Sequence, residues 1–143
     1  FLVTNRSTME MIKCANFCFV NPNITEDNLS VNEYKVGVVS SALWRFKDAS
    51  YFKIVSDMRK AGYRIGTIEE LASYPQKHIK NPVIALGSTC TVKDFGGNTL
   101  YFPIISGCGY TSNIMGKLAL VLTDTVSFND DCLFLGIKLC QSV

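Results

Sequence analysis

Two segments near the middle of the chain have the hydrophobic spacing of helices. In the first, from residue 48 to 61, the apolar side chains recur every three or four positions: Tyr51, Ile54, Val55, Met58 and Ala61. This spacing predicts a helix with one buried face. Asp48 or Ser50 can cap the free amide groups at its start, and Gly62 can end it in the left-handed conformation.

The second helical segment follows directly and opens on Thr67-Ile68-Glu69-Glu70. This is the pattern of a capping box, in which Thr67 caps the helix and Glu70 returns to the amide of Thr67. Its buried face is expected to consist of Ile68, Leu71 and Ala72. Glu69 is not needed for the cap, so we expect it to face water, and Pro75 lies near the helix end.

The remaining apolar segments have the character of strands. Residues 33–46 are rich in β-favouring and aromatic side chains and predict a first long strand. Residues 83–87 are wholly apolar, which is typical of a central strand covered on both faces. Further strands are expected at 92–95 and 99–102, as a hairpin around Gly96-Gly97-Asn98, and at 117–122 and 133–139. Residues 106–109 and 123–131 are expected to be loops.

This order of elements predicts an α+β fold: a strand, two helices, a strand and a hairpin-rich second half. The chain has 143 residues, of which 48% are hydrophobic and 18% charged, so it is expected to form one domain over residues 1–143. Residues 1–33 are polar and predict an extension packed on that domain, with a short helix after Ser7-Thr8.

Charge and hydropathy exclude two classes of partner. The formal net charge is only +2 and no cluster of Lys and Arg occurs, so no nucleic-acid partner is expected. The apolar run Leu118–Leu122 is far shorter than the about 20 residues that a bilayer-spanning helix needs. No membrane span is therefore expected.

Six cysteines are the main chemical feature of the composition: Cys14, Cys18, Cys90, Cys108, Cys132 and Cys140. An even number in a chain of this size favours a disulfide framework and an oxidising compartment, with free buried thiols as the alternative. The spacing lacks the paired ligands of a zinc site, and His78, the single histidine, is distant in sequence. No metal site is expected.

The sequence does not indicate catalysis. His78 stands among polar and basic residues and is expected on the surface, and no nucleophile motif of the G-x-S-x-G kind occurs. We therefore expect no enzyme and no cofactor.

Four patches, spread in order over most of the chain, match a family pattern. They are Glu10-Met11-Ile12 with residues 20–26, residues 62–71 (G-Y-R-I-G-T-I-E-E-L), residues 82–88 (P-V-I-A-L-G-S) and residues 133–138 (L-F-L-G-I-K). In this order they resemble C-type lectin-like domain proteins. Within this family they look like a bacterial and phage group, which in turn resembles the variable proteins diversified by retroelements.

The resemblance implies a fold and a function. The fold is a C-type lectin-like one, with two helices packed on a twisted, mostly antiparallel sheet, long C-terminal loops, and a last strand beside the first. The function is non-enzymatic recognition of a protein or glycan, in an extracellular location or on a cell or virion surface. The binding residues would lie between 108 and 131: Tyr110, Asn113, Lys117, Asp124, Phe128, Asn129, Asp130 and Asp131.

The same window departs from the family pattern, because residues 118–122 and Val126 make it apolar. The alternative is therefore a structural protein whose apolar window docks to another subunit or to a second copy as a homo-oligomer. Phe128-Asn129-Asp130 resembles the Trp-Asn-Asp of calcium-dependent lectins, but the partner loop motif is missing, so no Ca²⁺ site is expected.

The family's disulfides, carried over, would pair Cys140 with Cys14 or Cys18, and Cys132 with Cys90 or Cys108.

Overall fold

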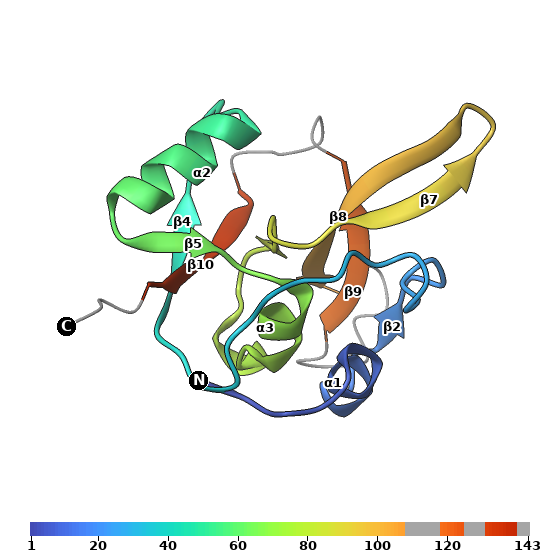
Figure 1. Cartoon of the computed structure of the whole chain (residues 1–143), viewed down its shortest axis with the longest axis horizontal. Helices are drawn as coiled ribbons and strands as arrows, with labels where there is room; N and C mark the ends of the chain where they lie inside the picture. Colours follow the sequence, from blue (N-terminus) through green and yellow to red (C-terminus); the bar gives the residue numbers. More distant parts are fainter. Residues whose placement is uncertain (108–117, 125–130, 140–143) are drawn as a thin grey trace.

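The computed structural model describes residues 1–107, 118–124 and 131–139 and shows an α+β architecture (Figure 1). Its helices are α1 (Thr8–Cys14), α2 (Tyr51–Lys60), α3 (Ile68–Ser73) and the 3-10 helix η1 (Gln76–His78). Its strands are β1 (Leu2–Val3), β2 (Phe19–Val20), β3 (Gly37–Val38), β4 (Ser41–Arg45), β5 (Tyr63–Ile65), β6 (Val83–Ile84), β7 (Cys90–Asp94), β8 (Gly97–Gly107), β9 (Leu118–Thr123) and β10 (Leu133–Lys138).

An eight-stranded mixed sheet forms the centre of the fold. Six of its strands follow the order β2-β9-β8-β6-β10-β4, while β5 pairs with β10 and β7 pairs with β8. The pairs β2–β9 and β6–β10 are parallel, and the other pairs are antiparallel. β10 is thus hydrogen-bonded to three strands, one of which is β4, through Leu133–Ile137 opposite Arg45–Ser41. The last long strand therefore lies beside β4, an early strand of the chain.

The central strands bury side chains on both faces of the sheet. Val83 and Ala85 belong to one hydrophobic cluster, whereas Ile84 and Leu86 belong to another. This alternation follows from the two-residue period of a strand. The prediction that residues 83–87 are covered on both faces is confirmed for residues 83–86, although regular pairing as β6 is limited to Val83–Ile84.

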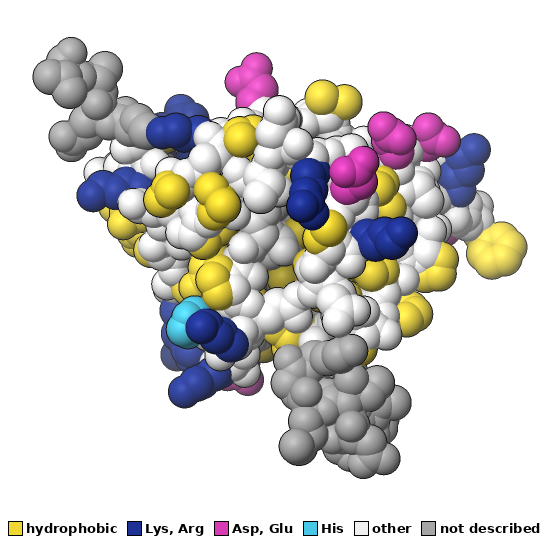
Figure 2. Space-filling view, turned by 90° about the horizontal axis from the view of Figure 1, so that it is seen from below, with side chains coloured by type: hydrophobic (Ala, Val, Ile, Leu, Met, Phe, Trp, Pro, Cys, Tyr) yellow, Lys and Arg dark blue, Asp and Glu magenta, His cyan; other side chains and the backbone are white. Residues whose placement is uncertain are grey.

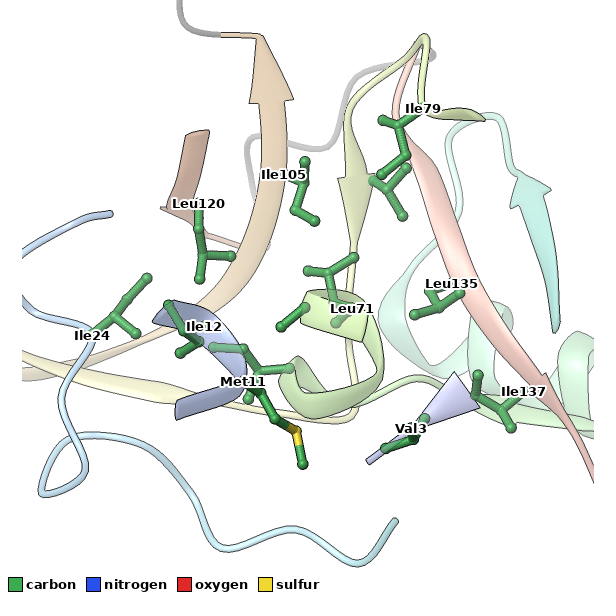
Figure 3. Close-up of a cluster of buried hydrophobic side chains, with 14 of the residues drawn as sticks. Val3, Met11, Ile12, Ile24, Leu71, Ile79, Ile105, Leu120, Leu135 and Ile137 are labelled. Atoms are coloured by element: carbon green, nitrogen blue, oxygen red, sulfur yellow. The ribbon is translucent and has the colours of Figure 1, made fainter. Parts of the chain in front are cut away.

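Different helices cover the two faces. The first cluster contains Met11 and Ile12 of α1 together with residues of α3 such as Leu71, and Figure 3 shows these side chains meeting Ile105, Leu120 and Leu135 from the strands. The second cluster contains Ile54 and Met58 of α2. The sheet is therefore enclosed between α1 and α3 on one side and α2 on the other.

α3 begins where the sequence predicts, and α2 is shorter than the predicted 48–61 because Ser50, one of its two candidate caps, starts it at Tyr51. Ser50 caps α2 by accepting a hydrogen bond from the amide of Lys53, and Gly62 follows its end at φ +86°. Thr67 and Glu70 form the predicted capping box of α3, in which the amide of Thr67 donates to Glu70 Oε1 at 2.9 Å. These local signals were sufficient because capping involves residues only three positions apart.

The long strand expected at 33–46 is wrong for its first part. Residues 33–36 have no regular structure, and the remainder forms two short strands, β3 and β4. Gly37 has φ +117°, and β3 pairs with β1 in a separate two-stranded sheet. A further strand, β5, lies between Gly62 and the α3 cap, where the sequence analysis predicted none.

The predicted hairpin is confirmed and is longer than expected, but its turn is misplaced, because Gly97 and Asn98 belong to β8. Asp94 pairs with Gly97, so the two-residue loop is Phe95-Gly96, and β8 continues to Gly107. Residues 106 and 107 are therefore strand and not loop. In Figure 1 the β7–β8 hairpin extends away from the rest of the molecule, and Phe95 at its loop is fully exposed.

The first 33 residues do more than pack on the domain. β2 is an edge strand of the main sheet, and Met11 and Ile12 are buried in its core. Within the described ranges, no helix has the length and apolar character needed to cross a membrane.

Candidate functional site

Most of the binding residues expected from the sequence lie outside the described residues: Tyr110, Asn113, Lys117, Phe128, Asn129 and Asp130. The two that are described, Asp124 and Asp131, lie on either side of residues 125–130 in the chain. Asp124 follows β9 directly, and Asp131 comes shortly before β10, where its backbone carbonyl accepts a hydrogen bond from Asn81 Nδ2 at 3.3 Å.

The apolar run within the predicted window belongs to the core. Leu118–Leu122 lie in β9, and Ala119 and Leu120 are buried, with Leu120 fully inaccessible to solvent. This segment is therefore not a docking surface, which corrects part of the alternative assembly hypothesis. Val126 lies outside the described residues.

The described cysteines contradict one of the two bridges that the resemblance implies, the bridge of Cys132, and leave a Cys18–Cys140 bridge as a prediction. Cys14, Cys90 and Cys132 are free thiols, so the implied bridge of Cys132 is wrong, as is any bridge of Cys14. Cys18 is disulfide-bonded, whereas Cys108 and Cys140, the remaining candidates, lie outside the described residues. The Cys90 thiol donates to the carbonyl of Asn23 at 3.2 Å, and burial raises its pKa.

His78 is exposed on η1, as expected, among several basic side chains (Figure 2). Most acidic side chains on this face lie towards the opposite edge. Among the described residues, no group of three His, Cys, Asp or Glu side chains is placed to hold a metal ion.

The most concentrated polar chemistry in the described structure surrounds the two glutamates of α3, and Glu70 is the more completely paired of them. It is fully buried, and the guanidinium of Arg64 donates two hydrogen bonds to its carboxylate, Nη1 to Oε1 at 2.8 Å and Nη2 to Oε2 at 2.6 Å. The amide and hydroxyl of Thr67 donate to the same carboxylate. A buried charge with this many donors is a structural element of the fold.

Glu69 does not face water, contrary to expectation. It is only 2% exposed, and its carboxylate accepts from Asn32 Nδ2, at 3.0 Å for Oε1 and 3.5 Å for Oε2. The expectation failed because the partner lies 37 residues away, on a segment without regular structure that packs over the start of α3.

Asn32 is held in one orientation by two serines. Its Nδ2 also donates to Ser88 Oγ at 2.6 Å, and its Oδ1 accepts from Ser30 Oγ at 2.7 Å. Ser88 Oγ accepts a further hydrogen bond from the amide of Ile68 at 2.7 Å. This network links the segment before β3, the start of α3 and the segment after β6, so the amide that contacts Glu69 is fixed in position.

A cavity of about 260 Å³ opens beside this network and is called the Glu69 cavity below. Its walls come from the start of α1, from the segment 26–34 and from α3. They consist of Ser7, Thr8, Met9, Glu26, Leu29, Ser30, Val31, Asn32, Tyr34 and Glu69.

Burial raises the pKa of Glu69, and the neighbouring charge of Glu70 raises it further, while the hydrogen bond from Asn32 lowers it only in part. Burial and the charge of Glu69 likewise raise the pKa of the Tyr34 hydroxyl. A carboxyl group that is difficult to ionise and borders a cavity is a frequent property of functional sites.

The raised pKa of Glu69 predicts how stability depends on pH. The folded protein holds the carboxyl proton of Glu69 more tightly than the unfolded chain does. The contribution of this group to the free energy of unfolding is therefore fully present below the unfolded-state pKa and is lost as pH rises through the folded-state pKa. We therefore expect the difference in unfolding free energy between wild type and Glu69→Gln to fall as pH rises from about 4 to about 8. Urea denaturation at a series of pH values measures it.

The matched control is Glu10→Gln, which makes the same chemical change on the exposed side of α1. Its stability is expected to follow wild type at every pH. A wild-type advantage over Glu69→Gln that grew with rising pH would contradict the prediction.

Comparison with protein-family models, curated proteins and solved structures found no match to this chain. The site residues that sequence reasoning missed are Asn32, Tyr34 and Ser88. The sequence around these three residues gives no sign of a site. The pair Glu69-Glu70 after the Thr67 cap marks the position of Glu69, but it does not indicate which residues contact its side chain.

Proposed function

We propose that the chain is a non-enzymatic recognition domain of the C-type lectin-like kind, which presents its C-terminal loops to a protein or glycan in an extracellular location or on a cell or virion surface. The observation that carries the proposal is the antiparallel pairing of β10 with β4 over five residues of each strand. After β4 come the helices α2 and α3, then β6, and then β7, β8 and β9 before β10, and the resemblance implies this order apart from the added short elements β5 and η1.

The described scaffold suits such a function. The loop segments expected to bind ligand connect β8 to β9 and β9 to β10, and these strands are anchored in the two hydrophobic clusters. Binding residues are commonly carried by connections between rigid elements, because a fixed scaffold lowers the entropy lost on association.

The recognition proposal is tested at residues of the predicted loops. Asn113→Ala, Lys117→Ala and Asp130→Ala are expected to weaken binding to a glycan array or to surface proteins of a candidate host cell by about tenfold. Their melting temperatures should stay close to that of wild type. Leu120→Ala, in the core strand β9, is the contrasting control and should lower the melting temperature.

Loss of folding in all three loop variants would contradict the proposal. A stable oligomer in light scattering, with no binding to any ligand, would instead support the assembly alternative. One observation favours that alternative: Phe95 at the tip of the β7–β8 hairpin is fully exposed, and Leu100 on the same hairpin is more than half exposed.

A further inference from the structure

We propose that the Glu69 cavity binds the ammonium group of an alkylammonium ligand, with the carboxylate of Glu69 as its counter-ion. The Glu69 cavity is separate from the C-terminal loops, because its lining residues belong to α1 and its cap Ser7, to the segment 26–34 and to α3.

The two adjacent glutamates of α3 differ in how many hydrogen-bond donors their carboxylates receive. Glu70 receives donors from a guanidinium, an amide and a hydroxyl, whereas among the described residues the carboxylate of Glu69 receives only amide donors, from the side chain of Asn32 and from its own backbone. A carboxylate has about four acceptor positions. Arg64 pairs with Glu70, whereas no ion pair of Glu69 is found within the described part of the chain. A buried carboxylate with few donors is strongly stabilised by a cation that enters beside it.

The walls of the Glu69 cavity carry mainly hydrogen-bond acceptors. Ser7, Thr8 and Tyr34 offer hydroxyl oxygens, and Glu26 adds a second carboxylate, so acceptors predominate. No lysine or arginine is among the described residues that line the cavity. A primary ammonium group carries three donors and one positive charge, which matches a wall of acceptors around one buried carboxylate.

The Glu69 cavity is small and partly apolar. Met9, Leu29 and Val31 give the cavity an apolar portion that suits a short alkyl chain. At about 260 Å³ the cavity lies below the usual range for drug-sized ligands, so it suits a small head group or the end of a lysine side chain. The ring of Tyr34 can add a cation–π contribution.

The groups that face Glu69 set its response to pH. Across the cavity these are Glu26 and Tyr34, on α3 the neighbour is Glu70, and α1 contributes Ser7, Thr8 and Met9, which do not titrate. Because the ligand pairs with the ionised carboxylate, binding should displace the proton that the raised pKa of Glu69 retains. An alkylammonium ion itself stays charged up to about pH 10.

The test is a titration of the whole protein with n-butylammonium chloride, followed by amide chemical shifts, against sodium chloride at equal ionic strength and against n-butanol. We expect butylammonium to cause saturable chemical-shift changes at the amides of residues 30–34 and of Glu69. Sodium chloride and n-butanol should cause none. Glu69→Gln should weaken binding by about tenfold or more, because it removes the counter-ion. Glu10→Gln, which removes an exposed carboxylate on α1, should change affinity by less than about twofold.

A second measurement needs no variant. Wild-type affinity should fall as pH is lowered from about 8 through the pKa of Glu69, because protonation removes the negative charge. The proposal is overturned if butylammonium causes no saturable shift at these residues. Equal binding by Glu69→Gln and wild type, or an affinity independent of pH, overturns it as well.

A parallel titration with Nα-acetyl-lysine-N-methylamide separates the two sources of the same chemistry. Tighter binding of the lysine derivative assigns the cavity to a lysine side chain of a protein partner, and tighter binding of butylammonium assigns it to a free amine. Either result supports the proposal, provided that binding depends on Glu69.

Discussion

Replacing Arg64 with methionine is expected to lower the free energy of unfolding by about 3–5 kcal/mol, because the change leaves a buried carboxylate without its cation. Glu70 is fully buried, and Arg64 supplies two of its hydrogen bonds, both at 2.8 Å or less. Methionine preserves most of the apolar stem, so the measured loss reports mainly the charge. Urea denaturation followed by circular dichroism gives the free energy.

The matched control removes an exposed ion pair. Lys53→Met breaks a contact with Asp57 on the exposed side of α2, where the lysine side chain is 62% exposed. Its expected cost is below about 0.5 kcal/mol. The double variant Arg64→Met/Glu70→Gln removes the buried charge and keeps a capping oxygen, so it should recover part of the loss. Similar costs for Arg64→Met and Lys53→Met would show that the buried pair contributes little.

Gly87→Ala is expected to lower the free energy of unfolding by about 3 kcal/mol, the upper end for an overpacked site. A Cβ at this position would lie 2.6 Å from the carbonyl oxygen of Gly66 and 3.0 Å from that of Ile65. Both contacts are with backbone, so no side chain can rotate to relieve them. The amide of Gly87 also donates to the Gly66 carbonyl at 2.7 Å, which fixes the two segments close together.

Gly96→Ala is the corresponding control, because the nearest atom to its added Cβ is Asp94 Oδ1 at an ordinary 3.5 Å. It should change stability by less than about 0.5 kcal/mol. The measurement is again urea denaturation, and wild-type stability in Gly87→Ala would mean that the backbone around Gly66 shifts at little cost.

Features that depend on near neighbours were predictable from the sequence. The α3 capping box and the Ser50 cap of α2 each involve residues three positions apart, so the pattern itself specifies the contact. The two-sided burial of residues 83–86 was also predictable, because an apolar residue at every position leaves no polar face for solvent.

Features that depend on distant partners were not predictable. β5 is a strand because Tyr63–Ile65 pair with Lys138–Gly136 of β10. The three residues of β5 are too few to predict a strand from their own sequence. The same applies to the candidate site. Glu69 is buried because Asn32 packs over it from 37 residues away, and a glutamate next to a capping glutamate usually faces solvent. Of the loop residues expected to bind ligand, only Asp124 and Asp131 are among those described.

The position of β10 also constrains the time at which the protein can fold during synthesis. This strand is hydrogen-bonded to β4, β5 and β6, yet it follows all three in the chain, after β7, β8 and β9. A nascent chain that ends before residue 133 leaves the edges of all three earlier strands exposed to other chains. On the ribosome, closure of the sheet must therefore wait until β10 itself has left the exit tunnel, after α2 and α3 have already done so, which makes folding slow relative to helix formation.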